Sequence, residues 1–416
     1  MIHGERRTFP GDLFPLATDD LLAALARLPE DLQPIMPLKE KHRRALAGGV
    51  RRLSAFLTVE RDKLPHDYMA RPEYLSAYLH YFLPWNMYRQ GRLLRGLDLS
   101  IRDNAVIMDF GAGPLTFLNA LWLTRSHLRD RSFRYYAYDR SEPALKAGFR
   151  LFQTYAGAAG RSWRVRTERR LGAARGHAPA DMIVAGNFIN ELSPPRPAAS
   201  AAAAEEATAE DRLLARWDAL LKPDAAILVI EPGTRASSRQ LVRLRGAALA
   251  RGWQVAAPCT HTGTCPVPGT RGSAWCHFNF KPGDIPEKLF KFSRKVGLPK
   301  ESASLSFLLL TRGENPPVQH AAVARPSGPE GPVRVISEPF ALPGDLQGRY
   351  GCGERGLVLL QDSGREGGGP PPGALLRVKY PAQMARDPKS RALIIPARRP
   401  GGHSRKKPPT SQEPRS

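Results

Sequence analysis

The chain has 416 residues, of which 42% are hydrophobic, so it can bury a substantial core and is not disordered throughout. No apolar run reaches the length of about eighteen residues that a membrane-spanning helix needs, which excludes such a helix. The formal net charge of +23 favours an anionic partner, and nucleic acid fits best because each neutralised phosphate releases counterions. A solvated basic surface with a basic tail is the alternative interpretation.

Residues 1–100 are predicted to form a helical region. The stretch TDDLLAALARL offers Thr18 or Asp19 as a helix cap and repeats leucine at helical spacing. A later stretch, RPEYLSAYLHYFLPWNMYR, sets four aromatic residues on one helical side: Tyr74, Tyr78, Tyr81 and Tyr88. Such stripes usually pack in a core, and contact with RNA is the alternative. The amino terminus lacks an apolar signal-peptide centre and carries acidic residues, so we expect a cytoplasmic protein that does not contact membranes.

Residues 101–312 are predicted to form an α/β domain with a parallel sheet. Six short apolar runs, from AVIMDF to SLSFLLLTR, alternate with helical segments, which is typical of that class. A Pro- and Gly-rich linker is expected over 313–332, followed by a small β-rich module over 333–398. The end of the chain, 399–416, is basic and predicted to be disordered.

The clearest ligand chemistry lies in VIMDFGAGPLTFLNALWL. A buried strand is predicted to end at Asp109, and Gly111 and Gly113 form the turn that follows. Glycines there let the backbone approach a ligand at a helix N-terminus in an open α/β sheet. The dinucleotide pattern GxGxxG would need glycine where Thr116 stands. Asp139 ends the next strand, where a carboxylate can accept hydrogen bonds from two ribose hydroxyls. A tight turn with a capping aspartate is the structural alternative.

The fourth strand of the domain runs into AGNFINELSP at the same edge of the predicted sheet. Asn187, Asn190 and Glu191 are therefore candidates for orienting a substrate in catalysis. A structural role, in which the side-chain amide forms its hydrogen bonds within the protein, is an equal alternative for Asn190. The pattern does not specify the acceptor of the reaction.

Three of the four cysteines fall within APCTHTGTCPVPGTRGSAWCHF, an insertion over 257–280 at the carboxyl end of the sixth strand. Cys259, Cys265 and Cys276 are separated by five and ten residues, and Cys352 follows in the β-rich module. Zinc sites favour two to four intervening residues in each pair, which neither gap matches. A four-thiolate iron–sulfur cluster tolerates a distant fourth ligand, which would fasten the module to the sheet domain. Buried thiols without a metal are the structural alternative.

Several of these motifs carry a resemblance to known families. The form Asp-x-Gly-x-Gly resembles motif I of the class I S-adenosylmethionine-dependent methyltransferases. The combination of PCTHTGTCP and WCHF with DFGAGP, NFINEL, IEPGT and the upstream YLHYFLPWNMYR resembles the methyltransferase-like assembly factors of the mitochondrial small ribosomal subunit and their bacterial relatives. This resemblance runs from about residue 70 to residue 312, with Cys352 as a further match.

The resemblance implies a class I methyltransferase fold, a Rossmann-like seven-stranded sheet. It implies S-adenosylmethionine at Asp109, Gly111, Gly113 and Asp139, and a 4Fe–4S cluster on Cys259, Cys265, Cys276 and Cys352, with zinc as the alternative metal. It also implies binding to small-subunit ribosomal RNA during assembly. We therefore expect a monomeric RNA methyltransferase, with a non-catalytic assembly factor or a zinc-stabilised RNA-binding protein as alternatives.

Overall fold

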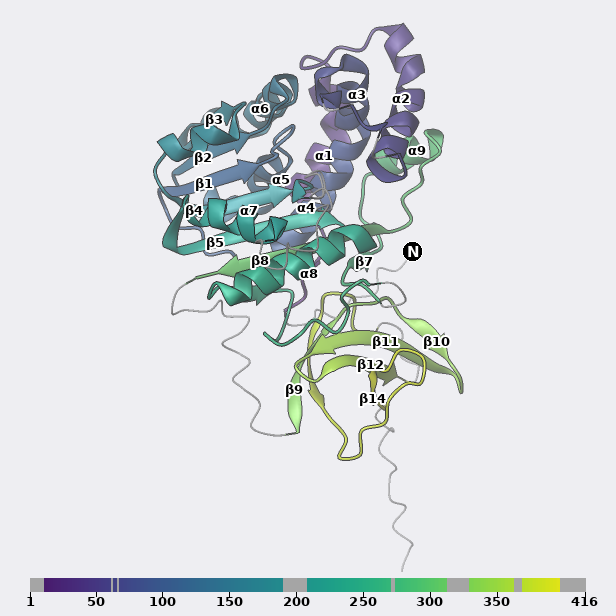
Figure 1. Ribbon diagram of the computed structural model, residues 1–416. Helices are drawn as coiled ribbons and strands as arrows, with labels where there is room; N and C mark the ends of the chain where they lie inside the picture. Colours follow the sequence, from purple (N-terminus) through teal and green to yellow (C-terminus); the bar gives the residue numbers. More distant parts are fainter. Residues whose placement is uncertain are drawn as a thin grey trace, which may run out of the picture.

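The computed structural model describes residues 11–60, 63–65, 67–189, 208–270, 274–312, 329–362 and 369–396. Figure 1 shows three parts in chain order: a helical region, a large sheet covered by helices, and a smaller β module. The predicted tail, 399–416, lies outside the described residues, as does most of the predicted linker.

The helical region precedes the sheet. Its elements are α1 (Asp19–Leu32), α2 (Glu40–Thr58), η2 (Tyr68–Ala70), α3 (Pro72–Ala77), the π-helical turn η3 (Tyr78–Phe82) and α4 (Leu83–Gly96). Thr18 caps α1, because its hydroxyl accepts a hydrogen bond from the backbone N–H of Leu21 at 3.4 Å. The four stripe tyrosines are each at most 8% exposed, which confirms the core interpretation of that stripe.

The large sheet follows the order β3-β2-β1-β4-β5-β8-β6, and β7 pairs with β8 beside β6. The strands are β1 (Ala105–Phe110), β2 (Phe133–Tyr138), β3 (Trp163–Glu168), β4 (Ala180–Gly186), β5 (Leu221–Pro232), β6 (Gln254–Ala257), β7 (Phe278–Phe280) and β8 (Ala303–Thr311). The first five run parallel, whereas β8 is antiparallel to β5, β6 and β7. This is the seven-stranded order of the class I methyltransferase fold, with β7 added, so the predicted fold class is confirmed.

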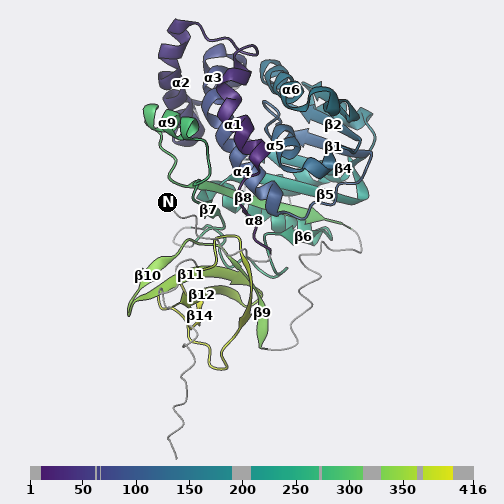
Figure 2. The ribbon, with the colours of Figure 1, turned by 180° about the vertical axis from the view of Figure 1, so that it is seen from behind.

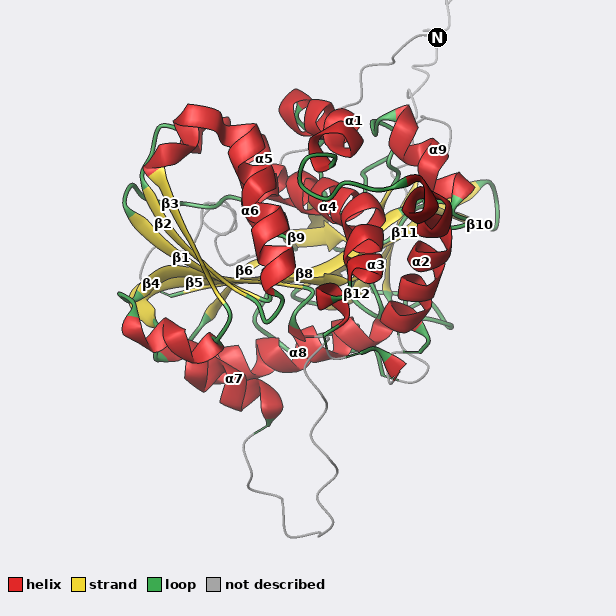
Figure 3. Cartoon of the chain, turned by 90° about the horizontal axis from the view of Figure 1, so that it is seen from above, coloured by secondary structure: helices red, strands yellow, loops and turns green. Residues whose placement is uncertain are grey.

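Helices cover both faces of this sheet, and its strands alternate between two cores. Ala105 and Ile107 of β1 belong to one core, whereas Val106 and Met108 belong to the other. Figure 3 shows α5 and α6 on one face and α7 and α8 on the opposite face. The helical elements of the domain are α5 (Thr116–Thr124), η4 (Ser126–Leu128), α6 (Glu142–Ala156), η5 (Gly157–Ser162), η6 (Leu171–Gly176), α7 (Ala209–Asp218), α8 (Arg235–Ala250) and α9 (Glu287–Lys295). Burial on both faces explains the continuously apolar strands of the sequence.

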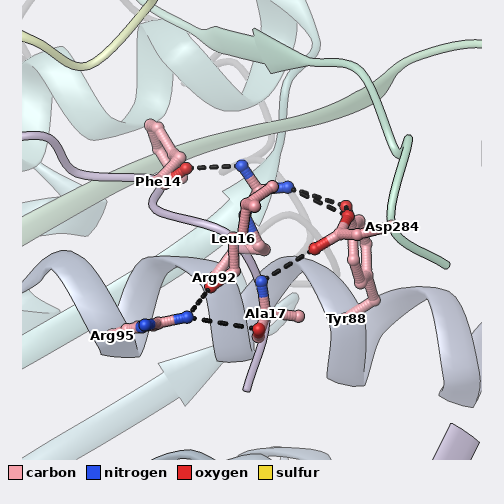
Figure 4. Close-up of polar contacts among 7 residues, drawn as sticks. All are labelled: Phe14, Leu16, Ala17, Tyr88, Arg92, Arg95 and Asp284. Carbon is pink, nitrogen blue, oxygen red and sulfur yellow. Dashed lines mark hydrogen bonds and ion pairs between the residues drawn. The ribbon is translucent and has the colours of Figure 1, made fainter. Parts of the chain in front are cut away.

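A buried ion pair holds the segment before α1 against the sheet domain (Figure 4). Arg92 of α4 pairs with Asp284 at 3.4 Å, and both side chains are less than 15% exposed. The Asp284 carboxylate also accepts hydrogen bonds from the backbone N–H of Ala17, at 2.8 Å, and from the hydroxyl of Tyr88. Arg92 donates in turn to the carbonyl of Phe14. The segment is therefore linked by hydrogen bonds to Arg92 of α4 and to Asp284 in the loop before α9.

The β module lies below the sheet domain in Figures 1 and 2. Its strands are β9 (Glu330–Val335), β10 (Phe340–Leu342), β11 (Leu346–Gly353), β12 (Gly356–Asp362), β13 (Leu375–Lys379) and β14 (Leu393–Ile395), and they form one sheet in the order β13-β9-β11-β12-β14, with β10 paired to β11. Because β9 begins at Glu330, strand structure starts inside the segment 313–332 that was predicted to be linker.

Candidate functional site

The turn after β1 needs glycine at two positions. Gly111 and Gly113 have φ angles of +71° and +50°, a region that L side chains rarely adopt. A Cβ at Gly111 would also lie 2.6 Å from Cδ2 of Phe188, which leaves no room for a side chain. The backbone N–H of Gly111 donates to the carbonyl of Tyr138 at 2.8 Å, so the turn is fixed to the end of β2.

Two carboxylates flank this turn. Asp109 is 2% exposed and accepts a hydrogen bond from the hydroxyl of Tyr135 at 2.7 Å. Asp139 accepts hydrogen bonds from the backbone N–H groups of Gly113, at 2.9 Å, and Ser141, at 2.8 Å. Burial raises the pKa of Asp109 to about 7; the hydrogen bond from Tyr135 lowers it, and the charge of Asp139 adds to the rise. Burial likewise raises the pKa of Asp139 against the two backbone hydrogen bonds.

A cavity of about 390 Å³ opens between this turn and the helical region. Its size falls in the range of small-molecule sites. Its walls contain five of the residues that the sequence singled out: Asp109, Gly111, Gly113, Asp139 and Asn187. A larger cavity of about 560 Å³ lies at the opposite, amino edge of the strands, next to Ala105 and Asp181. Ligands of open α/β sheets bind at the carboxyl edge, so the smaller cavity is the candidate site.

The candidate substrate-orienting residues are only partly described. Asn187 follows β4 with φ +55°, and its backbone N–H donates to the carbonyl of Ile230 at 2.7 Å. Asparagine tolerates this left-handed conformation better than most residues. Asn190 and Glu191 lie outside the described residues.

The second wall of the cavity comes from α2 to α4 and the loop after α9, and it was not predicted from the sequence. This wall includes Met69, Tyr78, Phe82, Asn86, Arg89, Gln90 and Lys300. Gln90 is 3% exposed, and its side-chain oxygen has no hydrogen-bond partner among the described residues. A buried amide oxygen without a partner is costly, which points to a donor on a bound ligand. The only sequence signal for this wall was the aromatic stripe, which was assigned to the core.

The four cysteines converge at the junction of the sheet domain and the β module. Burial raises the pKa of Cys276, and the neighbouring thiols of Cys259, Cys265 and Cys352 raise it further. His261 Nε2 lies 3.4 Å from the sulfur of Cys352 on β11. Within the described ranges, no group of three or more His, Cys, Asp or Glu side chains is placed to hold a single metal ion. The thiols are thus close enough to interact electrostatically but are not arranged around one ion.

Two buried arginines face the cysteines. Arg245 of α8 is 5% exposed and donates to the carbonyl of His261 at 2.7 Å. Burial raises the pKa of Cys259, whereas the charge of Arg245 and a hydrogen bond from it lower that pKa. Arg334 of β9 is 3% exposed and donates to the carbonyls of Gly11, at 2.7 Å, and Pro258, at 3.3 Å. Arg334 therefore joins the amino-terminal segment, the cysteine loop and the β module.

Residues 101–339, more than half of the chain, match the family model described as mitochondrial small ribosomal subunit Rsm22. The chain belongs to the Rsm22 family. The family resemblance predicted from the sequence is thereby confirmed. The Rsm22 match includes the glycine turn and the first three cysteines, but it ends before Cys352 and begins after the helical wall of the cavity.

Solved structures give fold-level similarity only. A precorrin-6y C5,15-methyltransferase from Geobacter metallireducens has 12% identity and a TM-score of 0.34, covering 54% of this chain and 89% of its own. An S-adenosylmethionine-dependent methyltransferase from Thiobacillus denitrificans, in complex with S-adenosyl-L-homocysteine, has 11% identity and a TM-score of 0.33, covering 60% and 99%. A putative class I methyltransferase from Listeria monocytogenes has 10% identity and a TM-score of 0.32, covering 71% and 87%. At such scores they carry no argument about this Rsm22 family member, whose fold rests on its own strand order. No curated protein matches the chain.

In the part of the chain that the structure describes, no helix combines the length and apolar character needed to cross a membrane. The family description names the mitochondrion, which stands against the cytoplasmic location expected from the sequence.

Proposed function

We propose that the chain binds S-adenosylmethionine in the cavity beside the glycine turn and methylates small-subunit ribosomal RNA during assembly. One observation carries this proposal: the glycine turn, Asp109 and Asp139 meet at the carboxyl edge of a methyltransferase-type sheet, in a member of a small-subunit family. The bound cofactor would supply an electrophilic methyl group.

The cavity residues fit this cofactor chemically. A carboxylate has about four acceptor sites, so Asp139 can accept from ribose hydroxyls while it keeps its two backbone hydrogen bonds. Asp109 and the unpartnered oxygen of Gln90 supply acceptors for the ammonium group of the cofactor. Asn187, together with Asn190 and Glu191 as predicted from the sequence, would orient the acceptor nucleotide. In-line positioning supplies most of what methyl transfer requires.

The labelling experiment uses immature small subunits and a tritiated methyl donor. We expect label in the ribosomal RNA with the wild-type protein and none with Gly111→Ala, because the new Cβ would meet Phe188 and close the turn. Gly172→Ala is the matched control, since a Cβ there meets no atom within 4 Å. Cofactor binding by the wild type without labelled RNA would instead establish the non-catalytic assembly factor.

We expect S-adenosylmethionine to bind more tightly as the pH rises through about 7. The folded-state pKa of Asp109 is raised from 3.8 to about 7, so its ionisation destabilises the folded protein across that interval, and a bound cation offsets this cost. A single ionisation near 7 predicts a gain in affinity of about tenfold between about pH 6 and pH 8, measured by calorimetry. The predicted gain in affinity applies only up to about pH 8, because Lys300 in the same cavity has its pKa lowered to about 8 and loses its charge above that pH.

Asp109→Asn is the control for this pH dependence. Its affinity should be weak and independent of pH over the same interval, because the amide does not titrate. A wild-type profile as flat as that of the variant would exclude Asp109 from cofactor binding.

We also propose that Cys259, Cys265, Cys276 and Cys352 hold a 4Fe–4S cluster that braces the β module against the sheet domain. A single zinc ion would need sulfur atoms about 3.8 Å apart, given Zn–S bonds of 2.3 Å, and the described residues include no such group. A cluster of four irons and four sulfides spaces its thiolates more widely. Arg245 and Arg334 would offset the negative charge of the thiolates.

The compartment is a separate proposal. We propose that the protein acts in the cytoplasm on a ribosomal small subunit there. Cell fractionation tests this, and recovery with mitochondria would overturn it in favour of the family description.

A further inference from the structure

Two cations share the cavity wall without an acidic partner. Arg89 donates to the carbonyl of Ser304 at 2.7 Å and to the side-chain oxygen of Asn86, which are both neutral acceptors. The ammonium of Lys300 lies 5.9 Å from the ring centroid of Tyr81. Among the described residues, neither cation forms an ion pair. Burial, together with the nearby charge of Arg89, lowers the pKa of Lys300 to about 8.

The loop that carries Lys300 is held in place because its backbone carbonyls accept hydrogen bonds from side chains of η3 and α2. The hydroxyl of Tyr81 donates to the carbonyl of Leu298 at 2.7 Å, and Arg51 of α2 donates to the carbonyl of Val296 at 3.3 Å. Lys300 is therefore positioned by its loop at the cavity edge. Two like charges in a partly buried site repel each other, and an anion placed between them would relieve that repulsion.

Exposed basic side chains lead to this edge along α2 and α9, which lie side by side in Figures 1 and 2. We name them the basic flank: Lys39, Lys41, Arg43, Arg294 and Lys295. None of them has an ion-pair partner in the described part of the chain. Neighbouring cations are neutralised instead, as Lys291 pairs with Glu287 at 2.9 Å. α2 lines the cavity through Ser54 and Leu57 near its carboxyl end. Arg51, in the same half of α2, donates to the carbonyl of Val296, so the α9 part of the flank is the part nearest the candidate site.

We propose that the basic flank binds the phosphodiester backbone of single-stranded RNA, and that Lys300 binds the phosphate of the nucleotide entering the cavity, with Arg89 reinforcing the positive potential. This inference rests on the proposed function and adds the docking face. Phosphate contacts fix the register of a nucleic acid, so Lys300 would decide which base reaches Asn187. A duplex does not fit a cavity of about 390 Å³, so a nucleotide would have to leave the stack to reach the bound cofactor.

The carboxylate of the cofactor is a competing anion for Lys300. The basic flank favours RNA as the ligand of Lys300, because a small cofactor bound in the cavity would not contact the five exposed cations outside it. The two ligands also make different predictions. An RNA contact contributes counterion release, with a slope of about 0.7 per phosphate for single strands. A cofactor contact would leave the salt dependence of RNA binding unchanged.

The experiment measures RNA binding by fluorescence anisotropy across a salt series, with a short single-stranded RNA of mixed sequence, and S-adenosylhomocysteine binding by calorimetry. Lys300→Met should weaken RNA binding about fivefold at about 0.1 M salt and lower the salt slope by about 0.7. The double variant Arg294→Gln/Lys295→Gln should lower the slope by about 1.4. Lys300→Arg should restore binding. Lys291→Gln, on the same helix but paired with Glu287, is the matched control and should bind as the wild type does.

Each other outcome is decisive. If Lys300→Met weakens S-adenosylhomocysteine binding and leaves RNA binding intact, Lys300 binds the cofactor carboxylate and the inference is wrong. If the wild type binds RNA and every variant binds it equally, the docking face is wrong while the proposed function stands. If the wild type binds no RNA at all, the docking inference is wrong, and the labelling of immature subunits decides the proposed function separately. Equal thermal unfolding midpoints for the variants establish that the comparison concerns binding and not folding.

Discussion

Gly148→Ala is expected to destabilise the protein by about 3 kcal/mol, near the upper end for overpacking. Gly148 lies on α6, where an added Cβ would stand 2.2 Å from the carbonyl carbon and oxygen of Pro114. These are backbone atoms of the glycine turn, and they cannot move aside as a flexible side chain can. Leu115 is held by a hydrogen bond from its N–H to the carbonyl of Ala112 at 2.8 Å. Urea unfolding measures the loss of stability.

Cofactor binding should fall together with stability in this variant, because α6 and the turn that carries Gly111 and Gly113 share one contact. Gly246→Ala is the matched control. Gly246 is also inside a helix, α8, but a Cβ there meets no atom within 4 Å, so alanine should stabilise the protein by up to about 1 kcal/mol. Equal free energies of unfolding for the two variants would show that α6 does not approach the turn as closely as described.

The sheet was predictable where its strands are covered on both faces. AVIMDF of β1 is buried throughout, so its apolar run is continuous and the turn after it is marked by glycine. The edge strand β3 was absent from the apolar runs noted in the sequence, because WRVRTE alternates buried and exposed positions and places Arg164 and Arg166 in solvent. The alternation of apolar and polar residues in β3 was a usable signal for a strand, but this strand contains few apolar residues. The six runs therefore indicated the fold class without its outer edge.

Tertiary contacts determine the parts of the structure that no local sequence pattern predicts. Cys352 lies on β11, a strand whose sequence GRYGCG is typical of a turn. A Cβ at Gly351 would stand 2.4 Å from Cγ1 of Val333, so the glycine serves close packing with β9. Lys300 lines the cavity because its loop is held against α2 and η3, which no local sequence pattern predicts. The convergence of the four cysteines was expected both from the clustering of three of them in one loop and from the family resemblance, although their spacing fits no short zinc motif. The cofactor roles of Asp109, Gly111, Gly113 and Asp139 remain predictions.

Cys352→Ser is expected to abolish the inorganic centre and to separate the β module from the sheet domain. Three of the proposed ligands lie in one loop, so Cys352 alone would carry the metal-mediated link to β11. Iron and sulfide, expected at about four each per chain in the anaerobically purified wild type, should fall below one. The brown colour and association with the small ribosomal subunit should be lost together. Limited proteolysis should separate the β module from the sheet domain faster if the brace is removed.

Cys352→Val separates ligation from packing. Cys352 is 8% exposed and belongs to the main hydrophobic core, so a buried thiol that only packs would be replaced by valine at small cost. If the sulfur is a ligand, valine and serine should lose iron alike, although valine keeps the apolar contacts. Retained subunit association in a colourless Cys352→Val protein would falsify the brace and leave Arg334 as the link, through its hydrogen bonds to Gly11 and Pro258. One zinc per chain in the wild type would keep a metal but replace the cluster. The comparison of the two variants therefore tests whether the module is held by coordination or by the arginine alone.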